Sequence, residues 1–294
     1  MKASGFAYFR ANSVSDAVAA FRNCEGEARY LAGGQSLLAS MNLRLQSPEL
    51  LIDIAHIGEL RGIEIRGSEV RIGSLTRHAE VLSSPIIAAR VPLLAAAAPW
   101  VAHPAIRNKG TMGGSIALAD PASEFPAVAL ALNARVELHN GDRVRFVDAD
   151  DFFLDLYETA AEPDEILAAV WFPISGPNAR SCFDELARRR GDYAVVGVAI
   201  AANFRAEIVE DIRIVFLSVG PTPQRAQRAE AALKGTALGE EDIAASQRAL
   251  ADDLSAASED INTSAATRRH LAGVLLRRRL DTLRLSASAG ATAS

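Results

Sequence analysis

Two glycine pairs followed by small polar residues are the strongest chemical signal in this 294-residue chain. Glycine has no Cβ, so the backbone there can adopt positive φ and approach another group closely. Successive N–H groups in such a turn form a concave surface that suits phosphate oxygens. Two such turns predict a site that binds a diphosphate from two sides. The first motif comprises Ala32, Gly33, Gly34, Gln35 and Ser36, and the second comprises Thr111, Met112, Gly113, Gly114 and Ser115.

The elements around these motifs favour anion binding. Residues 28–32 are typical of a strand and residues 37–45 of a helix, so the first motif is expected at a helix N-terminus, where unpaired N–H groups and the helix dipole favour negative charge. The second motif follows a basic loop that carries Arg107 and Lys109. Either motif taken singly remains open to another interpretation, a tight turn that needs glycine for geometry alone.

Few other residues indicate chemistry. The carboxylates of Asp120 and Glu124 can accept hydrogen bonds from sugar hydroxyls or cap a helix, and Tyr193 can stack on an aromatic ring or cover the core edge. The five histidines lack metal-ligand spacing, and the chain has no G-x-G-x-x-G, Walker A, G-x-S-x-G or H-E-x-x-H sequence. If the chain performs chemistry, a bound cofactor must carry it.

Composition limits the class of protein. The formal net charge of −5 argues against a nucleic-acid or anionic-membrane partner. No apolar run is long enough to span a bilayer, and the first residues lack the apolar core of a secretion signal, so we expect a cytoplasmic protein without membrane insertion. The two cysteines are too few to ligate an iron–sulfur cluster.

The hydropathy pattern predicts an α+β protein in two domains. Residues 63–72 and 136–146 are typical of hairpins, and residues 173–178 of a linker. Beyond the linker we expect a smaller α+β domain with two paired strands, over residues 196–204 and 212–217. Thr222-Pro223 is expected to open a helix that ends at Gly235. The last helix is expected to pack an apolar stripe against the sheet, formed by Ala272, Leu276, Leu280 and Leu283.

The motifs together carry a family resemblance over nearly the whole chain. They resemble the flavin-binding motifs of the medium, FAD-binding subunits of molybdenum hydroxylases, relatives of carbon monoxide dehydrogenase and xanthine dehydrogenase. The second motif is the most specific because the similarity there is long. The matching stretches are Ala32–Ser36, Arg107–Ser115, Ala119–Pro126, Gly191–Ala194 and Val219–Pro223.

The resemblance implies a two-part, PCMH-type FAD-binding domain over residues 1–175, divided near 55–60, then an α+β C-terminal domain over 178–285 and a disordered tail over 286–294. Both glycine motifs would hold the diphosphate of an extended FAD. Glu124 would meet ribityl or ribose hydroxyls, and Tyr193 would lie near the isoalloxazine ring. Three residues depart from the family pattern, namely Gln35, Ser115 and Leu118.

The family also implies partners. Its members pass electrons from a molybdenum cofactor through two [2Fe–2S] clusters to FAD, and the cysteine shortage places those clusters on another chain. We therefore expect a small [2Fe–2S] subunit, a large molybdenum-cofactor subunit, a dimer of heterotrimers and an external electron acceptor. The alternatives are a stand-alone FAD-dependent oxidase or reductase, which would need acid–base groups in the second domain, and a scaffold protein that has lost FAD.

Overall fold

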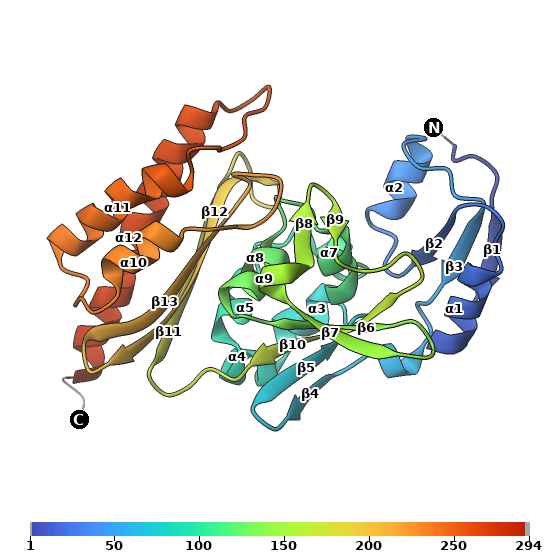
Figure 1. Ribbon diagram of the computed structural model, residues 1–294, viewed down its shortest axis with the longest axis horizontal. Coiled ribbons are helices and arrows are strands. Elements are labelled where there is room, and N and C mark those ends of the chain that lie inside the picture. Colours follow the sequence, from blue (N-terminus) through green and yellow to red (C-terminus); the bar gives the residue numbers. More distant parts are fainter. Residues whose placement is uncertain (1, 292–294) are drawn as a thin grey trace.

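The computed structural model describes residues 2–291, with side chains described as far as Leu285. Three regions follow one another along the chain (Figure 1): a small N-terminal lobe, a central region of helices on a five-stranded sheet, and a C-terminal sheet covered by three helices. The architecture is the mixed α+β class that the sequence predicts. Among the described residues, no helix has the length and apolar character needed to cross a membrane.

The N-terminal lobe is built on a parallel three-stranded sheet with the order β1-β3-β2. The predicted strand, glycine turn and helix are present, but the helix ends at Asn42 instead of Leu45 because Arg44 takes a left-handed conformation, with φ at 58°. Helix α1 is capped by Ser13, whose Oγ accepts from the Asp16 N–H at 3.1 Å. The elements are β1 (Ala7–Arg10), α1 (Val14–Arg22), β2 (Ala28–Leu31), α2 (Leu37–Asn42) and β3 (Leu50–Asp53).

The central region contains an antiparallel sheet with the order β4-β5-β10-β6-β7, and both predicted hairpins belong to it. Short helices pack against one face of this sheet and bury an alanine-rich core. The elements are η1 (Gly58–Leu60), β4 (Ile63–Arg66), β5 (Glu69–Gly73), α3 (His78–Ser83), α4 (Pro85–Arg90), α5 (Pro92–Ala97), α6 (Pro104–Arg107), α7 (Met112–Leu118), α8 (Glu124–Ala131), β6 (Arg135–His139), β7 (Val144–Asp148), α9 (Ala149–Phe152), β8 (Phe153–Asp155), β9 (Glu158–Thr159) and β10 (Ile166–Pro173).

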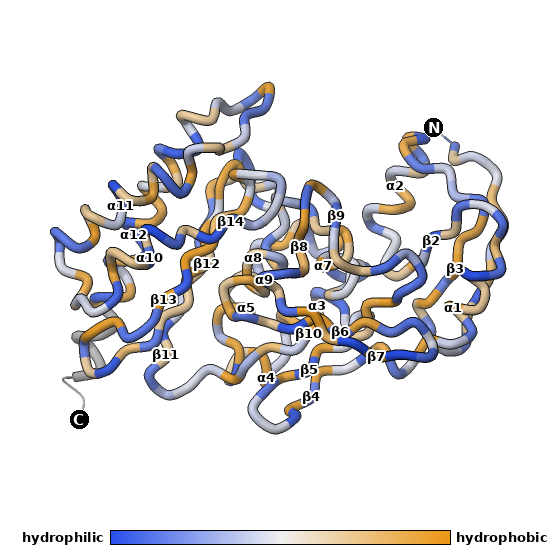
Figure 2. Tube along the Cα trace, in the orientation of Figure 1, coloured by the Kyte–Doolittle hydropathy of each residue, from blue (hydrophilic) through white to orange (hydrophobic). Residues whose placement is uncertain are grey.

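The C-terminal region has an antiparallel sheet with the order β11-β12-β13-β14. Its two long central strands are apolar over much of their length (Figure 2). The stripe predicted for the last helix is buried in one cluster with side chains from these strands. The elements are β11 (Ala179–Ala187), β12 (Ala194–Arg205), β13 (Ile208–Leu217), β14 (Gln224–Arg225), α10 (Gln227–Leu233), α11 (Glu240–Asp253) and α12 (Ala265–Ala291).

Two details of this region differ from the expectation. The helix expected from Thr222-Pro223 begins only at Gln227, because Gln224 and Arg225 pair with β13 and form β14 instead. The helix does stop just before Gly235, which has a φ of 82°. Of the tail expected over 286–294, residues 286–291 continue α12, whose backbone no proline interrupts, and residues 292–294 lie outside the described residues.

The central and C-terminal regions share one hydrophobic core. Phe183, Ala199 and Leu217 from the C-terminal sheet belong to the same buried cluster as Leu94 of α5 and Phe125 of α8. The opposite face of that sheet packs on the three C-terminal helices in a separate cluster. The N-terminal lobe has a smaller core that also takes in side chains from β10. The packing of α5 and α8 on the C-terminal sheet therefore fixes how the two regions meet.

Candidate functional site

The first motif forms the loop between β2 and α2. Gly34 has a φ of 70°, a conformation that glycine adopts without strain. The side-chain amide of Gln35 donates to the Gly33 carbonyl at 3.1 Å. Within the part of the chain that the structure describes, the N–H groups of residues 33–36 donate to no protein acceptor. The backbone N–H groups of this loop can therefore donate hydrogen bonds to a bound anion.

The first glycine motif meets the backbone directly ahead of the second. A Cβ on Gly33 would lie 2.3 Å from the carbonyl oxygen of Lys109 and 3.1 Å from the Cα of Gly110. Contacts of 2.3 Å are essentially never seen for a real Cβ. Residues 33 and 109 are far apart in the sequence, and only glycine at 33 permits this approach. The structure therefore places the first motif against the segment that leads directly into the second.

The second motif differs from the expected donor turn. Gly113 and Gly114 lie in the first turn of α7, and the N–H of Gly113 donates to the Ser74 carbonyl at 2.8 Å. The N–H of Gly114 donates to the Thr111 hydroxyl, which caps the helix, at 3.1 Å. A Cβ on Gly113 would lie 2.3 Å from the Cβ of Ser74. Gly113 thus permits close packing, whereas Gly114 is exposed and keeps the surface free of a Cβ.

A buried histidine contacts the backbone at the start of the second motif. The Nε2 atom of His78 lies 2.9 Å from the Thr111 carbonyl, and its backbone N–H donates to the Gly110 carbonyl at 3.1 Å. Burial lowers the pKa of His78 to about 4, and the charges of Arg107 and Arg77 act in the same direction, so the ring is neutral at pH 7. Spacing alone gives no signal for this role, because His78 and Thr111 are distant in sequence.

The predicted acidic residues lie between the end of α7 and the first turn of α8. The hydroxyls of Ser115 and Ser123 lie 2.7 Å apart and connect α7 to the start of α8. Glu124 follows as the first residue of α8 and is 9% exposed. Burial raises its pKa to about 7, and the nearby charge of Asp120 adds to the effect. Partial burial and the charges of Asp120 and Glu124 also raise the pKa of Tyr193, although this residue is 74% exposed. The structure therefore brings the predicted pair Glu124 and Tyr193 into one electrostatic environment.

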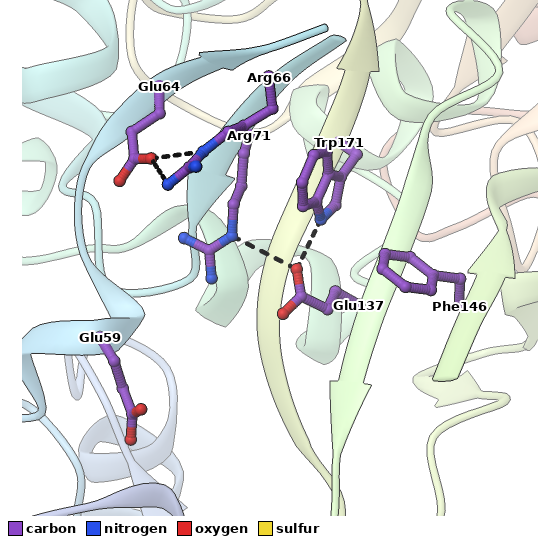
Figure 3. Close-up of a pocket in the computed structure, with 7 residues that line it drawn as sticks. All are labelled: Glu59, Glu64, Arg66, Arg71, Glu137, Phe146 and Trp171. Atoms are coloured by element: carbon purple, nitrogen blue, oxygen red, sulfur yellow. Dashed lines mark hydrogen bonds and ion pairs between the residues drawn. The ribbon is translucent and has the colours of Figure 1, made fainter. Parts of the chain in front are cut away.

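A separate cavity of about 450 Å³ lies over the central sheet (Figure 3). There the indole N–H of Trp171 donates to Glu137 at 2.6 Å, and Arg71 lies 3.4 Å from the same oxygen. Burial by itself would raise the pKa of Glu137, but these partners and His139 lower it overall. None of the residues predicted to bind a cofactor lines this cavity. Its lining residues are Glu59, Glu64, Arg66, Arg71, Glu137, Phe146 and Trp171.

Comparison with known families identifies the family of this chain. Residues 4–175 match the family described as "FAD binding domain in molybdopterin dehydrogenase", and residues 181–283 match "CO dehydrogenase flavoprotein C-terminal domain". The chain belongs to the FAD-binding subunits of the molybdenum hydroxylases. The predicted family, cofactor FAD and oxidoreductase class are thereby confirmed.

Individual relatives match this flavoprotein subunit over nearly the full length of both chains. The chain is 39% identical over 278 residues to the nicotine 6-hydroxylase medium subunit of Paenarthrobacter nicotinovorans, covering 95% of this chain and 97% of that one. It is 38% identical over 277 residues to the carbon monoxide dehydrogenase medium chain of Hydrogenophaga pseudoflava, covering 94% and 96%. A solved structure of carbon monoxide dehydrogenase from that organism, lacking the Mo-pyranopterin moiety, superposes with a TM-score of 0.91 at 40% identity, covering 95% and 96%.

The residues of this flavoprotein subunit fit a bound FAD. The loop at 33–36 offers unpaired N–H groups with little side-chain bulk, which suits a diphosphate. Two buried polar atoms without a protein partner, Ser74 Oγ and His78 Nδ1, belong to residues that pack against Gly113 and Gly110 respectively. Among the described residues, no group of three or more His, Cys, Asp or Glu side chains is arranged to hold a metal ion. The unpaired N–H groups at 33–36 suit a phosphate-bearing organic cofactor.

Proposed function

We propose that this subunit binds FAD between its two glycine motifs and passes electrons from [2Fe–2S] clusters on a partner subunit to an external acceptor. The observation that carries the proposal is the loop of unpaired N–H groups at 33–36, held against the backbone of Lys109 and Gly110. Such a loop stabilises two phosphate charges without a counterion from solvent.

Each predicted residue has a role in this proposal. Residues 32–36 hold the diphosphate, with the backbone N–H groups of residues 33–36 as donors, and residues 111–115 supply a close-fitting surface together with the Ser115 hydroxyl. Glu124 meets ribityl or ribose hydroxyls, and Tyr193 lies near the isoalloxazine ring. The bound FAD supplies the redox chemistry, because it exchanges electrons both singly and in pairs. The protein contributes the position and the electrostatic environment of the cofactor.

The cysteines support a role as one subunit of a complex. Cys182 is buried, and burial raises the pKa of its thiol to about 12, so it is not the thiolate that a cluster needs. Cys24 is far from it in the sequence and belongs to the N-terminal lobe. We place the clusters on a small subunit and the molybdenum cofactor on a large subunit, assembled as a dimer of heterotrimers in the cytoplasm.

The test is purification of the chain with its natural partners. Native mass spectrometry should find a large subunit and a cysteine-rich small subunit, and extraction should release FAD in a 1:1 ratio to this chain. The flavin absorbance should bleach when substrate is added to the complex and should not bleach for the chain alone. Stoichiometric FMN, or no flavin, would contradict FAD binding, and turnover by the isolated chain would instead support a stand-alone oxidase or reductase.

A further inference from the structure

Arg77 lies where the first glycine motif meets the segment that leads into the second, although the sequence pattern does not single it out. Its backbone forms an isolated antiparallel bridge with Thr111. Its side chain reaches further back along that segment, where the guanidinium Nη1 donates to the Lys109 carbonyl. A Cβ on Gly33 would lie 2.3 Å from this same oxygen. The guanidinium and the first motif therefore meet at one carbonyl group.

The positive charge of Arg77 has no acidic partner. Across the side chains that the structure describes, no carboxylate forms an ion pair with this partly exposed guanidinium. Glu80, the acid nearest to it in the sequence, instead accepts from the backbone N–H of Arg77 at 2.7 Å. The charge does reach the second motif, because it is one of the causes that lower the pKa of His78, after burial and the charge of Arg107. An unpaired cation thus stands at the junction of the two motifs.

Arg107, the arginine that the basic loop before the second motif suggests for an anion, is engaged elsewhere. Its Nη1 lies 2.8 Å from the carbonyl oxygens of both Val101 and Ala102. Both carbonyls belong to the loop that precedes α6, so Arg107 holds its own loop together. Arg77 instead donates across to a segment distant in the sequence and keeps its charge beside the first glycine motif.

A diphosphate held by the loop at 33–36 brings negative charge that the backbone N–H groups do not neutralise, because these groups carry only partial charges. An arginine suits this task. Its planar guanidinium presents several N–H donors to phosphate oxygens, and it stays charged throughout the pH range of a folded protein. Arg77 uses one nitrogen on the Lys109 carbonyl and has further N–H groups to donate.

We propose that Arg77 is a further FAD-binding residue: its charge compensates the diphosphate, and its hydrogen bond holds the Lys109 carbonyl against the first glycine motif. This inference rests on the proposed function, in which FAD lies between the two motifs. Arg77 then takes the electrostatic role that the basic loop suggests for Arg107. Glycine at 33 and arginine at 77 act together, since both meet the same carbonyl oxygen.

The first test measures FAD binding to the cofactor-free full chain by flavin fluorescence, for the wild type, Arg77→Lys and Arg77→Gln. Lysine keeps the charge, whereas glutamine keeps N–H donors without it. At about 0.02 M NaCl the dissociation constant of R77Q should exceed that of the wild type about tenfold, and that of R77K should stay within about threefold. Equal binding by all three proteins would overturn the proposal.

Salt separates the charge from a merely structural role. At about 1 M NaCl charges are screened within about 3 Å, so the difference between R77Q and the wild type should shrink to about threefold or less. A difference that persists unchanged at high salt would show that Arg77 only holds the Lys109 carbonyl, and the charge role would be refuted. Arg248→Gln is the matched control, because this exposed arginine of α11 likewise pairs with no acid in the described part of the chain. R248Q should bind FAD as the wild type does at both salt concentrations.

The wild type alone provides a test that does not depend on the folding of a variant. Its dissociation constant for FAD should rise several-fold from low to high salt, because an ionic contact with the diphosphate is screened. The same value at both salt concentrations would contradict the proposal. If the wild type binds FAD and R77Q binds it equally well, this inference fails and the proposed function stands. Failure of the wild type to bind FAD at either salt concentration would refute the proposed function, and the role of Arg77 with it.

Discussion

Replacing Gly33 by alanine should weaken FAD binding without unfolding the chain. The new Cβ would lie 2.3 Å from the Lys109 carbonyl oxygen, whereas real contacts of this kind keep at least 3.0 Å, so the loop must move by about 0.7 Å. The carbonyl cannot easily give way, because it also accepts from the Arg77 guanidinium, and the next carbonyl accepts from the His78 N–H. A displacement of this size stretches an N–H···O bond from about 2.9 Å to about 3.6 Å, which is no longer a hydrogen bond.

The magnitude follows from the donors that are misplaced. A hydrogen bond to a charged group contributes about 1.5–3 kcal/mol, so loss of one such bond raises the dissociation constant about 10- to 100-fold. The assay is titration of FAD into the cofactor-free chain by flavin fluorescence, with thermal unfolding of the same sample. Gly58→Ala is the matched control, because nothing lies within 4 Å of a Cβ there. A G33A dissociation constant within twofold of the wild type would refute the reasoning.

Three further outcomes test the site. Thr111→Ala should lower the free energy of unfolding by about 1 kcal/mol, because the Gly114 N–H loses its cap; urea unfolding measures this, and Thr111→Ser should retain most of the stability. The free energy of unfolding of the wild type should fall by on the order of 2–3 kcal/mol as pH falls from 6.5 to 4, because His78 takes up a proton in the unfolded chain but stays neutral in the folded one. His78→Gln should flatten this pH dependence, and an unchanged slope of unfolding free energy against pH would contradict the assignment. Tyr193→Leu should weaken FAD binding up to about tenfold at unchanged melting temperature, since the residue is exposed, whereas Tyr193→Phe should bind as the wild type does.

Local patterns predicted the elements around the site because each one is decided by neighbouring residues. The strand, glycine turn and helix of the first motif follow from residues 28–45 alone, and the structure forms all three in this order, although the helix ends at Asn42. The roles of the individual glycines could not be predicted in this way. Gly33 is needed because of Lys109, and Gly113 is needed because of Ser74, and both neighbours are brought there by tertiary folding.

The inward-facing acid of β11 did have a signal in the sequence. Asp184 and Glu185 are adjacent acids in a stretch that is otherwise apolar enough to be a strand, so one of them must face inwards whichever way the strand is turned. The surroundings of that inward acid were not predictable, since the helices that pack on this face of the sheet come from another part of the chain. The start of α10 was missed for a related reason. Residues 224–225 pair with strand β13, and this tertiary contact outweighs the local helix signal of Thr222-Pro223.

The core that joins the C-terminal sheet to α5 and α8 limits how these proteins can recombine. The two matched family segments meet near residue 176, but side chains such as Phe183 and Leu217 interdigitate with the helices of the preceding segment. A hybrid gene joined at that point would combine two halves of one packed interior from different parents. Such chimaeras should be stable only when the parents match on both sides of this packed interior, and the two segments should evolve and unfold as one cooperative unit.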